Sequence, residues 1–360
     1  MFSLSDIIDV QPFSLEHKDK DDLYFRVLSD LTKHHYDKCV PYHRVLDVLG
    51  ISPDQIKNVE DIPFIPVRLF KKYDLRSVDQ SQVIKTMTSS GTTGQSVSKI
   101  FLDRETSSNQ TKVLTKIVSS FIGKKRLPML VIDSKAVIKD RNLFSARGAG
   151  ILGFSMFGYD VQYALDDQMQ MDIPLVQSFI EKHKDEPILL FGFTFMIWEH
   201  FYTALKNAGN RLSLDNGIII HGGGWKKLME QAVDNTTFKK CILDVCGIYN
   251  IYNYYGMVEQ TGSIFMECEA GHLHASIFSD IVIRDHRDFS SLPVGQEGIV
   301  QLLSLLPLSY PGHSLLSEDM GVILGEDGCS CGRKGKYFKI FGRIKNAEVR
   351  GCSDTYAKCV

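Results

Sequence analysis

The stretch TMTSSGTTGQSVSKI, residues 86–100, places a run of Thr, Ser, Gly and Gln between two more apolar flanks. Residues of these types cannot form a hydrophobic core, so the segment either lies in solvent or binds a polar group. Glycine permits positive φ, and hydroxyls together with unshielded backbone N–H groups form a concave set of donors that suits phosphate. The spacing differs from that of a P-loop, because Gly91 and Gly94 are three residues apart and Lys99 follows five residues later. From the residues alone, a phosphate-binding loop and a plain solvated loop are equally good interpretations.

An α/β pattern surrounds this stretch. Short runs of β-forming residues, PMLVID at 128–133, PILLFG at 187–192 and GIIIHG at 217–222, alternate with helical patterns. This alternation predicts parallel strands connected by helices. After residue 262 the strands are closely spaced with turn signals between them, which predicts a mixed or antiparallel β subdomain. We therefore expect a helical entry section at 1–80, an α/β core at 81–262, a β-rich subdomain at 263–340 and a tail at 341–360.

Bulk properties exclude several classes of protein. A formal net charge of -2 and a pI near 6.6 argue against a polyanion-binding surface, so we expect no nucleic-acid partner. No apolar run reaches the roughly 18 residues of a membrane-spanning helix, and the N-terminal residues lack the basic start of a signal peptide. Both observations predict a cytoplasmic protein without a membrane span. Eight cysteines in 360 residues are too dilute for a disulfide scaffold, so clustered cysteines are expected to be metal ligands or reactive thiols.

Four motifs in order along the chain resemble those of adenylate-forming enzymes, the acyl- and aryl-CoA synthetase superfamily. TSSGTTGQSVSK resembles the phosphate loop of that superfamily, and NIYNYYGMVEQTG is similar to its aromatic-Gly-x-Thr-Glu motif. In the second motif Val258 replaces the usual Thr and Glu259 is the acid. LLSEDMG, which contains Asp319, resembles the ribose-binding segment, and FGRIKNAEVRG resembles the hinge, with Lys345 at the pivot. Several ordered motifs are far more specific together than any one of them.

Two further stretches, HGGGWKK and EVRGCSD, narrow the resemblance to the acyl-protein synthetase branch, the LuxE-type synthetases, with phenylacetate-CoA ligases as the nearest cousins. The resemblance covers roughly residues 60–355. It implies an α/β fold, the large N-terminal domain of an adenylate-forming enzyme with mixed sheets flanked by helices and a β-rich subdomain. Residues 81–262 would then bind nucleotide and acyl group, and residues 341–360 would be a hinge remnant. We expect the mobile C-terminal domain and its catalytic Lys to be lacking.

The resemblance implies ATP and Mg²⁺ as cofactors, and it assigns residues to them. Glu259 would help to hold Mg²⁺ in catalysis, since a hard cation prefers carboxylate oxygen. The glycines after the 217–222 strand leave room for adenine or the acyl carboxylate at a carboxyl end, where open α/β sheets bind ligands. A surface acid, a turn cap and an empty strand-ending turn are the alternatives. The expected ATP- or AMP-binding residues are Ser89, Ser90, Gly91, Thr92, Thr93, Gly94, Gly223, Gly224, Tyr255, Asp319 and Arg343.

A second set of residues points to a metal ion. ECEAGHLH supplies Cys268 and two histidines, and CSCGR supplies Cys329 and Cys331. Thiolates with one imidazole suit tetrahedral Zn²⁺, and four protein ligands leave no open position for catalysis, so we expect a structural zinc. Unliganded thiols are the alternative, because Cys-x-Cys is less specific than Cys-x-x-Cys. Similar patterns in some phenylacetate-CoA ligase relatives favour His274 over His272 as the fourth ligand.

Cys352 is the expected acyl acceptor. By resemblance the acyl-carrying cysteine of acyl-protein synthetases lies in RGCS, and the nearby Arg350 would favour the reactive thiolate. We therefore predict a ligase that activates a carboxylic acid, by resemblance a fatty acid, to acyl-AMP and transfers the acyl group to Cys352. A reductase or acyltransferase protein would then receive it. The alternatives are an acyl-CoA ligase of the phenylacetate-CoA ligase type and a non-catalytic nucleotide-binding subunit of a biosynthetic complex.

Overall fold

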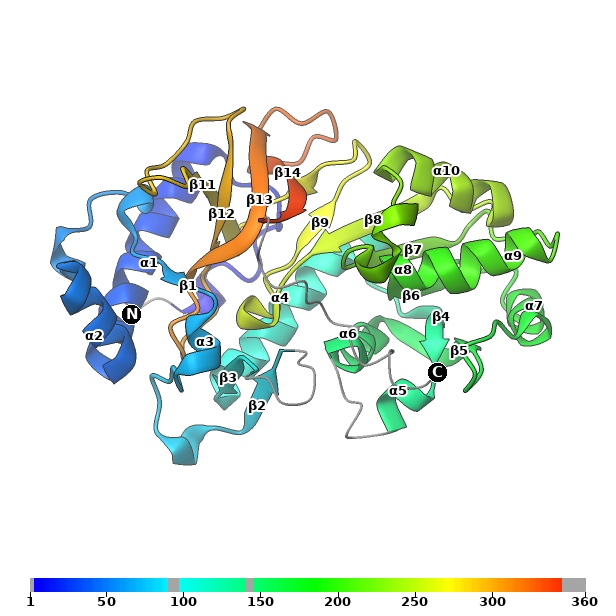
Figure 1. Cartoon of the computed structure of the whole chain (residues 1–360), viewed down its shortest axis with the longest axis horizontal. Helices are drawn as coiled ribbons and strands as arrows, with labels where there is room; N and C mark the ends of the chain where they lie inside the picture. The colour runs from blue at the N-terminus through cyan, green and yellow to red at the C-terminus, as the bar shows by residue number, and fades with distance from the viewer. Residues whose placement is uncertain (1–2, 90–96, 140–145, 345–360) are drawn as a thin grey trace. The chain divides into compact units, whose positions relative to one another are not determined.

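The computed structural model describes residues 3–89, 97–139 and 146–344 (Figure 1). Within these ranges the chain forms two compact units. The first unit comprises residues 3–89, 97–121 and 255–344, and the second comprises residues 122–139 and 146–254. The domain boundaries expected from the sequence remain a prediction.

The second unit is built on parallel strands in the order β8-β7-β6-β4-β5. This confirms the α/β alternation expected from the three apolar runs, which form the central strands. The strands are β4 (Leu127–Ser134), β5 (Gly158–Leu165), β6 (Leu189–Phe193), β7 (Ile218–Gly222) and β8 (Asn250–Tyr255). All residues of β4 and β6 are buried, as expected for strands covered on both faces.

Helices surround these strands (Figure 1). They are α5 (Ala136–Lys139), α6 (Ala146–Phe154), α7 (Ile173–Lys182), α8 (Thr194–Met196), a π-helix (Ile197–Tyr202), α9 (Thr203–Asn207) and α10 (Asn235–Cys246). Local signals set their ends. The carboxylate of Asp172 accepts from the backbone N–H of Leu175 at 3.0 Å and caps α7. Gly247 follows the last residue of α10 and terminates the helix, because its φ of 78° is the left-handed conformation that glycine adopts most readily.

The first unit combines helices with an antiparallel sheet in the order β11-β12-β13-β14-β10-β9, which confirms the β subdomain expected after residue 262. Its strands there are β9 (Phe265–Glu267), β10 (Leu273–His274), β11 (Ser279–Arg284), β12 (Glu297–Ser304), β13 (Ser314–Glu326) and β14 (Lys336–Arg343). The N-terminal part supplies α1 (His17–Lys38), α2 (Val40–Leu49), β1 (Ile65–Pro66), which pairs with β13, and α3 (Leu69–Lys72). A hairpin of β2 (Lys85–Thr88) and β3 (Lys99–Leu102) precedes α4 (Arg104–Ile122).

A buried ion pair fastens α1 to the antiparallel sheet. The Nζ atom of Lys20 lies 3.4 Å from Oδ2 of Asp280, and both side chains are 1% exposed. Lys20 also donates to the backbone oxygen of Ser279, and Lys336 approaches the same carboxylate at 3.5 Å. A buried charge without its partner is strongly unfavourable, so this arrangement fixes how α1 lies on β11. Among the described helices, none has the length and apolar content needed to cross a bilayer.

Two buried histidines make the first unit sensitive to acid. The rings of His35 and His313 stack with centroids 4.9 Å apart, and His35 contacts Oγ of Ser77 at 2.7 Å. Burial lowers the pKa of His35 well below its usual value and that of His313 to about 3, with the neighbouring imidazoles, including His34, acting in the same direction. The unfolded chain therefore binds more protons than the folded one below about pH 6.5, and stability falls as the pH decreases.

We expect the wild-type protein to lose about 1.4 kcal/mol of unfolding free energy per histidine between about pH 7.5 and about pH 5.5. Urea unfolding at the two pH values measures this loss. In His313→Gln the loss of unfolding free energy that comes from His35 and His313 should be about half as large, since one of the two titrating rings is removed. The comparison isolates the imidazoles from other groups, such as Asp133, whose pKa burial raises to about 6. An unchanged pH dependence in His313→Gln would contradict the prediction.

Candidate functional site

Glu259 lies in a buried turn that several contacts hold in place. It belongs to the 3₁₀ turn Val258–Gln260 and is 5% exposed. The hydroxyl of Tyr310 donates to the backbone oxygen of Glu259 at 2.9 Å. Gly262, with φ of 91°, closes the turn, and a Cβ there would lie 2.6 Å from the backbone oxygen of Gln110. Only glycine fits this position, because both the backbone conformation and the close approach exclude a side chain.

The environment of Glu259 disfavours its charge. Burial raises the pKa of its carboxyl, while the Ser98 hydroxyl and the positive charges of Lys71 and Arg343 partly oppose this increase. A carboxyl group that is buried beside cations is poised to ionise fully when a further cation binds.

Ser89 connects the start of the glycine-rich loop to this acid. In the β2–β3 hairpin Thr88 lies opposite Lys99. Two hydrogen bonds join the next pair of residues, Ser89 and Ser98. The N–H of Ser89 donates to the backbone oxygen of Ser98 at 3.1 Å, and the N–H of Ser98 donates to Oγ of Ser89 at 2.9 Å. The Ser98 hydroxyl is one of the groups that lower the pKa of Glu259. Ser89, the first residue of the expected phosphate loop, therefore lies near this acid, with Ser98 between them.

Three further expected residues also come together in the first unit. The hydroxyl of Tyr255 donates to Oδ2 of Asp319 at 2.6 Å. Burial first, and then the charge of Asp319, raise the pKa of Tyr255 well above its usual value, so the phenol stays protonated and donates. In the ladder between β13 and β14, Asp319 pairs with Arg343. Arg343 therefore lies beside the Tyr255–Asp319 pair and also acts on Glu259.

The glycine turn, defined as Gly222, Gly223 and Gly224, lies at the carboxyl end of β7 in the second unit. A Cβ on Gly222 would meet the ring of Tyr254 at 2.5 Å, and Gly223 has φ of 78°. Packing and backbone conformation therefore require the first two glycines. Gly224 differs, because its φ is ordinary and a Cβ there would meet no atom of the described residues within 4 Å. Gly223 and Gly224 are both exposed, as a ligand-contacting backbone requires.

The cysteine–histidine cluster, defined as Cys268, His274, Cys329 and Cys331, brings all four expected ligands together. Their ligand atoms lie within 4.8 Å of one another. Cys268 Sγ and Cys329 Sγ are 3.9 Å apart, and Cys331 Sγ is 3.4 Å from Nε2 of His274. His272 also approaches, with Nδ1 3.4 Å from Cys329 Sγ, but it is partly exposed whereas His274 is fully buried.

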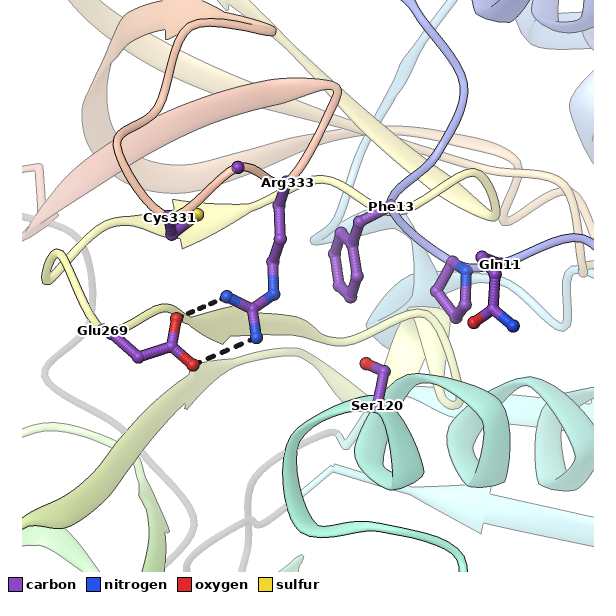
Figure 2. A pocket seen from close by; sticks show the side chains of 8 residues that line it. Gln11, Phe13, Ser120, Glu269, Cys331 and Arg333 are labelled. Atoms are coloured by element: carbon purple, nitrogen blue, oxygen red, sulfur yellow. Dashed lines mark hydrogen bonds and ion pairs between the residues drawn. The ribbon is translucent and has the colours of Figure 1, made fainter.

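A shallow pocket of about 430 Å³ borders this cluster (Figure 2). The guanidinium of Arg333 forms an ion pair with Glu269 and lies 4.2 Å from the ring centroid of Phe121. Phe13 lines the pocket beside it, and its backbone oxygen accepts from the N–H of Lys334 at 3.0 Å. The N-terminal segment is thereby fastened to the loop that carries Cys331.

Several expected residues lie outside the described ranges, namely Ser90, Gly91, Thr92, Thr93, Gly94 and Cys352. Conversely, the structure adds residues that were not among the expected ligands: Ser98 and Lys71 beside Glu259, and Thr194 at the glycine turn. Ser98 lies within the phosphate-loop motif but was not singled out there, and Lys71 and Thr194 are common residue types outside every motif.

Similarity to solved structures shows that the chain has the fold of the adenylate-forming ligases. The chain resembles 2-hydroxyisobutyryl-CoA ligase in an open conformation with 2-HIB-AMP and CoA, with a TM-score of 0.70, 16% identity, and coverage of 93% of this chain and 77% of that chain. The same ligase in its thioesterification state gives a TM-score of 0.69 at 17% identity, covering 92% of this chain and 70% of that chain.

The family follows from the sequence as a whole. The model of the acyl-protein synthetase family, LuxE, matches residues 3–360, and the chain belongs to that family. It is similar to the long-chain-fatty-acid–luciferin-component ligase of Vibrio harveyi, with 22% identity over 95% of this chain and 89% of the relative. The corresponding ligase of Aliivibrio fischeri is 20% identical over 80% of this chain and 76% of that relative. The chain is therefore an AMP-forming ligase, in agreement with the resemblance found in the motifs.

Proposed function

We propose that the protein activates a long-chain carboxylic acid with ATP and then carries the acyl group on Cys352. In the first step a carboxylate oxygen attacks the α-phosphorus of ATP, and pyrophosphate leaves to give acyl-AMP. In the second the Cys352 thiolate attacks the acyl carbonyl, AMP leaves, and a thioester forms. The names of the relatives support a long-chain fatty acid as substrate. We further propose a reductase or acyltransferase protein as the final acceptor, as the motif resemblance implies.

The observation that supports nucleotide binding most directly is the Tyr255–Asp319 contact. A carboxylate on β13 whose Oδ2 already accepts from Tyr255 has its other oxygen available to accept from ribose hydroxyls. Arg343, opposite Asp319 in the ladder, supplies positive charge for the phosphates. Ser89 and the residues after it, Ser90, Gly91, Thr92, Thr93 and Gly94, would add hydroxyl and backbone donors. Catalysis of this kind consists largely of positioning and charge neutralisation.

Glu259 is proposed to hold Mg²⁺. When bound, the ion would neutralise developing charge on the phosphates. The donor set fits, because Glu259 is a buried carboxyl with a raised pKa and the Ser98 hydroxyl lies beside it. Mg²⁺ typically uses one or two carboxylates together with substrate phosphates, so one acid is sufficient here.

The cysteine–histidine cluster is proposed to hold a structural Zn²⁺. Tetrahedral ligands with Zn–S bonds of about 2.3 Å place sulfur atoms about 3.8 Å apart. The 3.9 Å separation of Cys268 Sγ and Cys329 Sγ fits that geometry. The 3.4 Å contact between Cys331 and Nε2 of His274 also fits, since Zn–N bonds are shorter than Zn–S bonds. Four protein ligands leave no place for a reacting group, which supports a role in stability.

A labelling experiment tests the proposed function. The protein is incubated with ATP, Mg²⁺ and a panel of radiolabelled fatty and aromatic acids, then denatured and treated with hydroxylamine. We expect label from a long-chain acid to stay on the wild-type protein, to leave with hydroxylamine and to be absent from Cys352→Ser. Cys241→Ser serves as the matched control and should retain the label, because Cys241 lies outside every proposed site.

The alternatives give different results in the same experiment. An acyl-CoA ligase would leave no hydroxylamine-sensitive label, and Cys352→Ser would keep full activity with CoA. A non-catalytic nucleotide-binding subunit would bind ATP without acid-dependent pyrophosphate exchange. Absence of retained label with every acid tested would overturn the proposal.

The glycine turn provides a test of nucleotide binding. Gly224→Ala should fold normally, because a methyl group there meets no atom of the described residues, but it should raise the dissociation constant of ATP about tenfold by obstructing the ligand. Gly153→Ala is the matched control, since this glycine of α6 also has open space around it and belongs to the same unit. Calorimetric titration with ATP and thermal unfolding measure both variants. Equal ATP affinity in Gly224→Ala and Gly153→Ala would contradict the assignment of Gly224.

A further inference from the structure

The hydroxyl of Thr194 contacts three groups at the end of the neighbouring strand. Thr194 begins α8 directly after β6, in the second unit, and is 6% exposed. Its Oγ1 lies 2.9 Å from Nδ1 of His221, 2.9 Å from the backbone oxygen of Gly223 and 3.2 Å from that of Gly222. The strand register places Phe193 opposite Gly222, so these contacts join the carboxyl ends of two adjacent parallel strands.

The number of available protons decides whether Thr194 or His221 is the donor in their hydrogen bond. A threonine hydroxyl has one proton and two lone pairs, and carbonyl oxygens only accept. If Thr194 gave its proton to His221, its oxygen would face two carbonyl oxygens with no proton between them. The favourable arrangement has Nδ1–H of His221 donating to Oγ1, and the hydroxyl proton shared between the carbonyl oxygens of Gly222 and Gly223. Burial lowers the pKa of His221 to about 3, so the ring is neutral and carries that single proton.

This arrangement leaves a polar atom unsatisfied. With the proton on Nδ1, Nε2 of His221 is a bare acceptor, and within the described part of the chain it has no hydrogen-bond partner. The ring is 3% exposed and lies against Phe238, with centroids 4.8 Å apart. A buried acceptor without a donor is unfavourable and calls for an explanation. The orientation of the Thr194 hydroxyl explains it. When Nδ1–H of His221 donates to Oγ1 of Thr194, the hydroxyl proton of Thr194 points toward the carbonyl groups of the glycine turn.

We propose that Thr194, oriented by His221, is a positioning residue that fixes the glycine turn for nucleotide binding. The inference rests on the proposed function, since it assumes that this turn contacts the nucleotide. Gly223 and Gly224 are exposed and have no side chains of their own that could hold the turn in place. Holding two successive carbonyl groups from one side fixes the plane of the peptide that a flat ligand would lie against. A turn prearranged in this way avoids the ordering that binding would otherwise require.

The test compares two substitutions of one residue. Thr194→Val keeps the shape and removes the hydroxyl, whereas Thr194→Ser keeps the hydroxyl. We expect Thr194→Val to raise the KM for ATP in acid-dependent pyrophosphate exchange about tenfold or more, with the KM for the acid changed less than about threefold. Thr194→Ser should restore the KM for ATP to within about threefold of wild type. A purely structural role would lower the melting temperature without producing this split.

The matched control is Thr203→Val. The hydroxyl of Thr203 donates to the backbone oxygen of Trp198 at 2.9 Å, in the π-helix that follows α8, so the same chemical change is made away from the turn. It should lower the melting temperature comparably and leave the KM for ATP unchanged. Calorimetric titration with ATP reports on Thr194→Val even if exchange is too slow to measure.

The outcomes separate this inference from the function on which it rests. Wild-type exchange with equal ATP affinity in Thr194→Val and Thr203→Val would overturn the role of Thr194 alone. A wild-type protein that binds no ATP would overturn both. A double variant Thr194→Val/His221→Phe that is no worse than Thr194→Val supports the proposal, because His221 then acts through Thr194. If the two substitutions raise the KM for ATP by fully additive amounts, His221 does not act through Thr194 and that part of the proposal is overturned.

Discussion

Replacing Glu259 with Gln is expected to lower acid-dependent ATP–pyrophosphate exchange by about 100-fold or more, the loss typical of a removed charge-stabilising group. Gln has the same shape but no charge, and so removes the proposed carboxylate ligand of Mg²⁺ while leaving the turn held by Tyr310 and Gly262. The Mg²⁺ concentration for half-maximal exchange should increase at the same time. Because burial raises the pKa of Glu259, Mg²⁺ binding to the wild-type protein should also weaken as the pH falls through that raised value.

Glu326→Gln is the matched control for this substitution. Glu326 lies in the same unit, and its pKa is likewise raised by burial. Its carboxylate pairs with His17 at 3.0 Å, and neither residue is a proposed Mg²⁺ or nucleotide ligand. Its exchange rate should stay within about threefold of wild type. Unchanged Mg²⁺ dependence in Glu259→Gln, measured by initial exchange rates across a magnesium titration, would show that the ion is held elsewhere.

The strands and the class of fold could be predicted because their signals are local. The apolar runs that became β4, β6 and β7 are each buried on both faces, so composition alone marked them. The cysteine–histidine cluster was also predictable, since thiols and imidazoles are rare and the members of each pair are close in sequence. Cys268 directly follows β9 and His274 ends β10, whereas Cys329 and Cys331 lie between β13 and β14.

The supporting contacts could not be predicted, because they depend on which strands become neighbours. Thr194 meets the glycine turn only because β6 pairs with β7 in a particular register. Ser98 meets Glu259 across about 160 residues of sequence, and serine is too common to mark such a contact. The π-helix at Ile197–Tyr202 likewise has no signal in FMIWEHFY, which shows ordinary helical spacing.

The cysteine–histidine cluster carries the largest expected effect on stability. Removing the proposed Zn²⁺ by chelation, or replacing Cys268 with Ser, is expected to lower the unfolding free energy of the first unit by several kcal/mol, since structural zinc sites contribute on the order of 10 kcal/mol or more in small domains. The consequence should extend beyond the four ligands. The backbone N–H of Ile277, three residues after His274, donates to the oxygen of Pro12 at 2.7 Å. The N–H of Lys334, three residues after Cys331, donates to the oxygen of Phe13 at 3.0 Å.

Thermal unfolding and limited proteolysis measure this effect. Without metal, Arg333 would lose the fixed loop that places it over Phe121, and cleavage should appear first near Phe13, before the rest of the first unit is digested. Cys241→Ser, a thiol in the second unit, should keep both metal and melting temperature. Because the proposed ion only holds segments together, apo protein kept cold and folded should still exchange pyrophosphate, and added zinc should restore stability. Less than about 0.1 equivalent of zinc in protein purified without chelator would contradict the site, because tetrahedral thiolate sites retain their ion tightly.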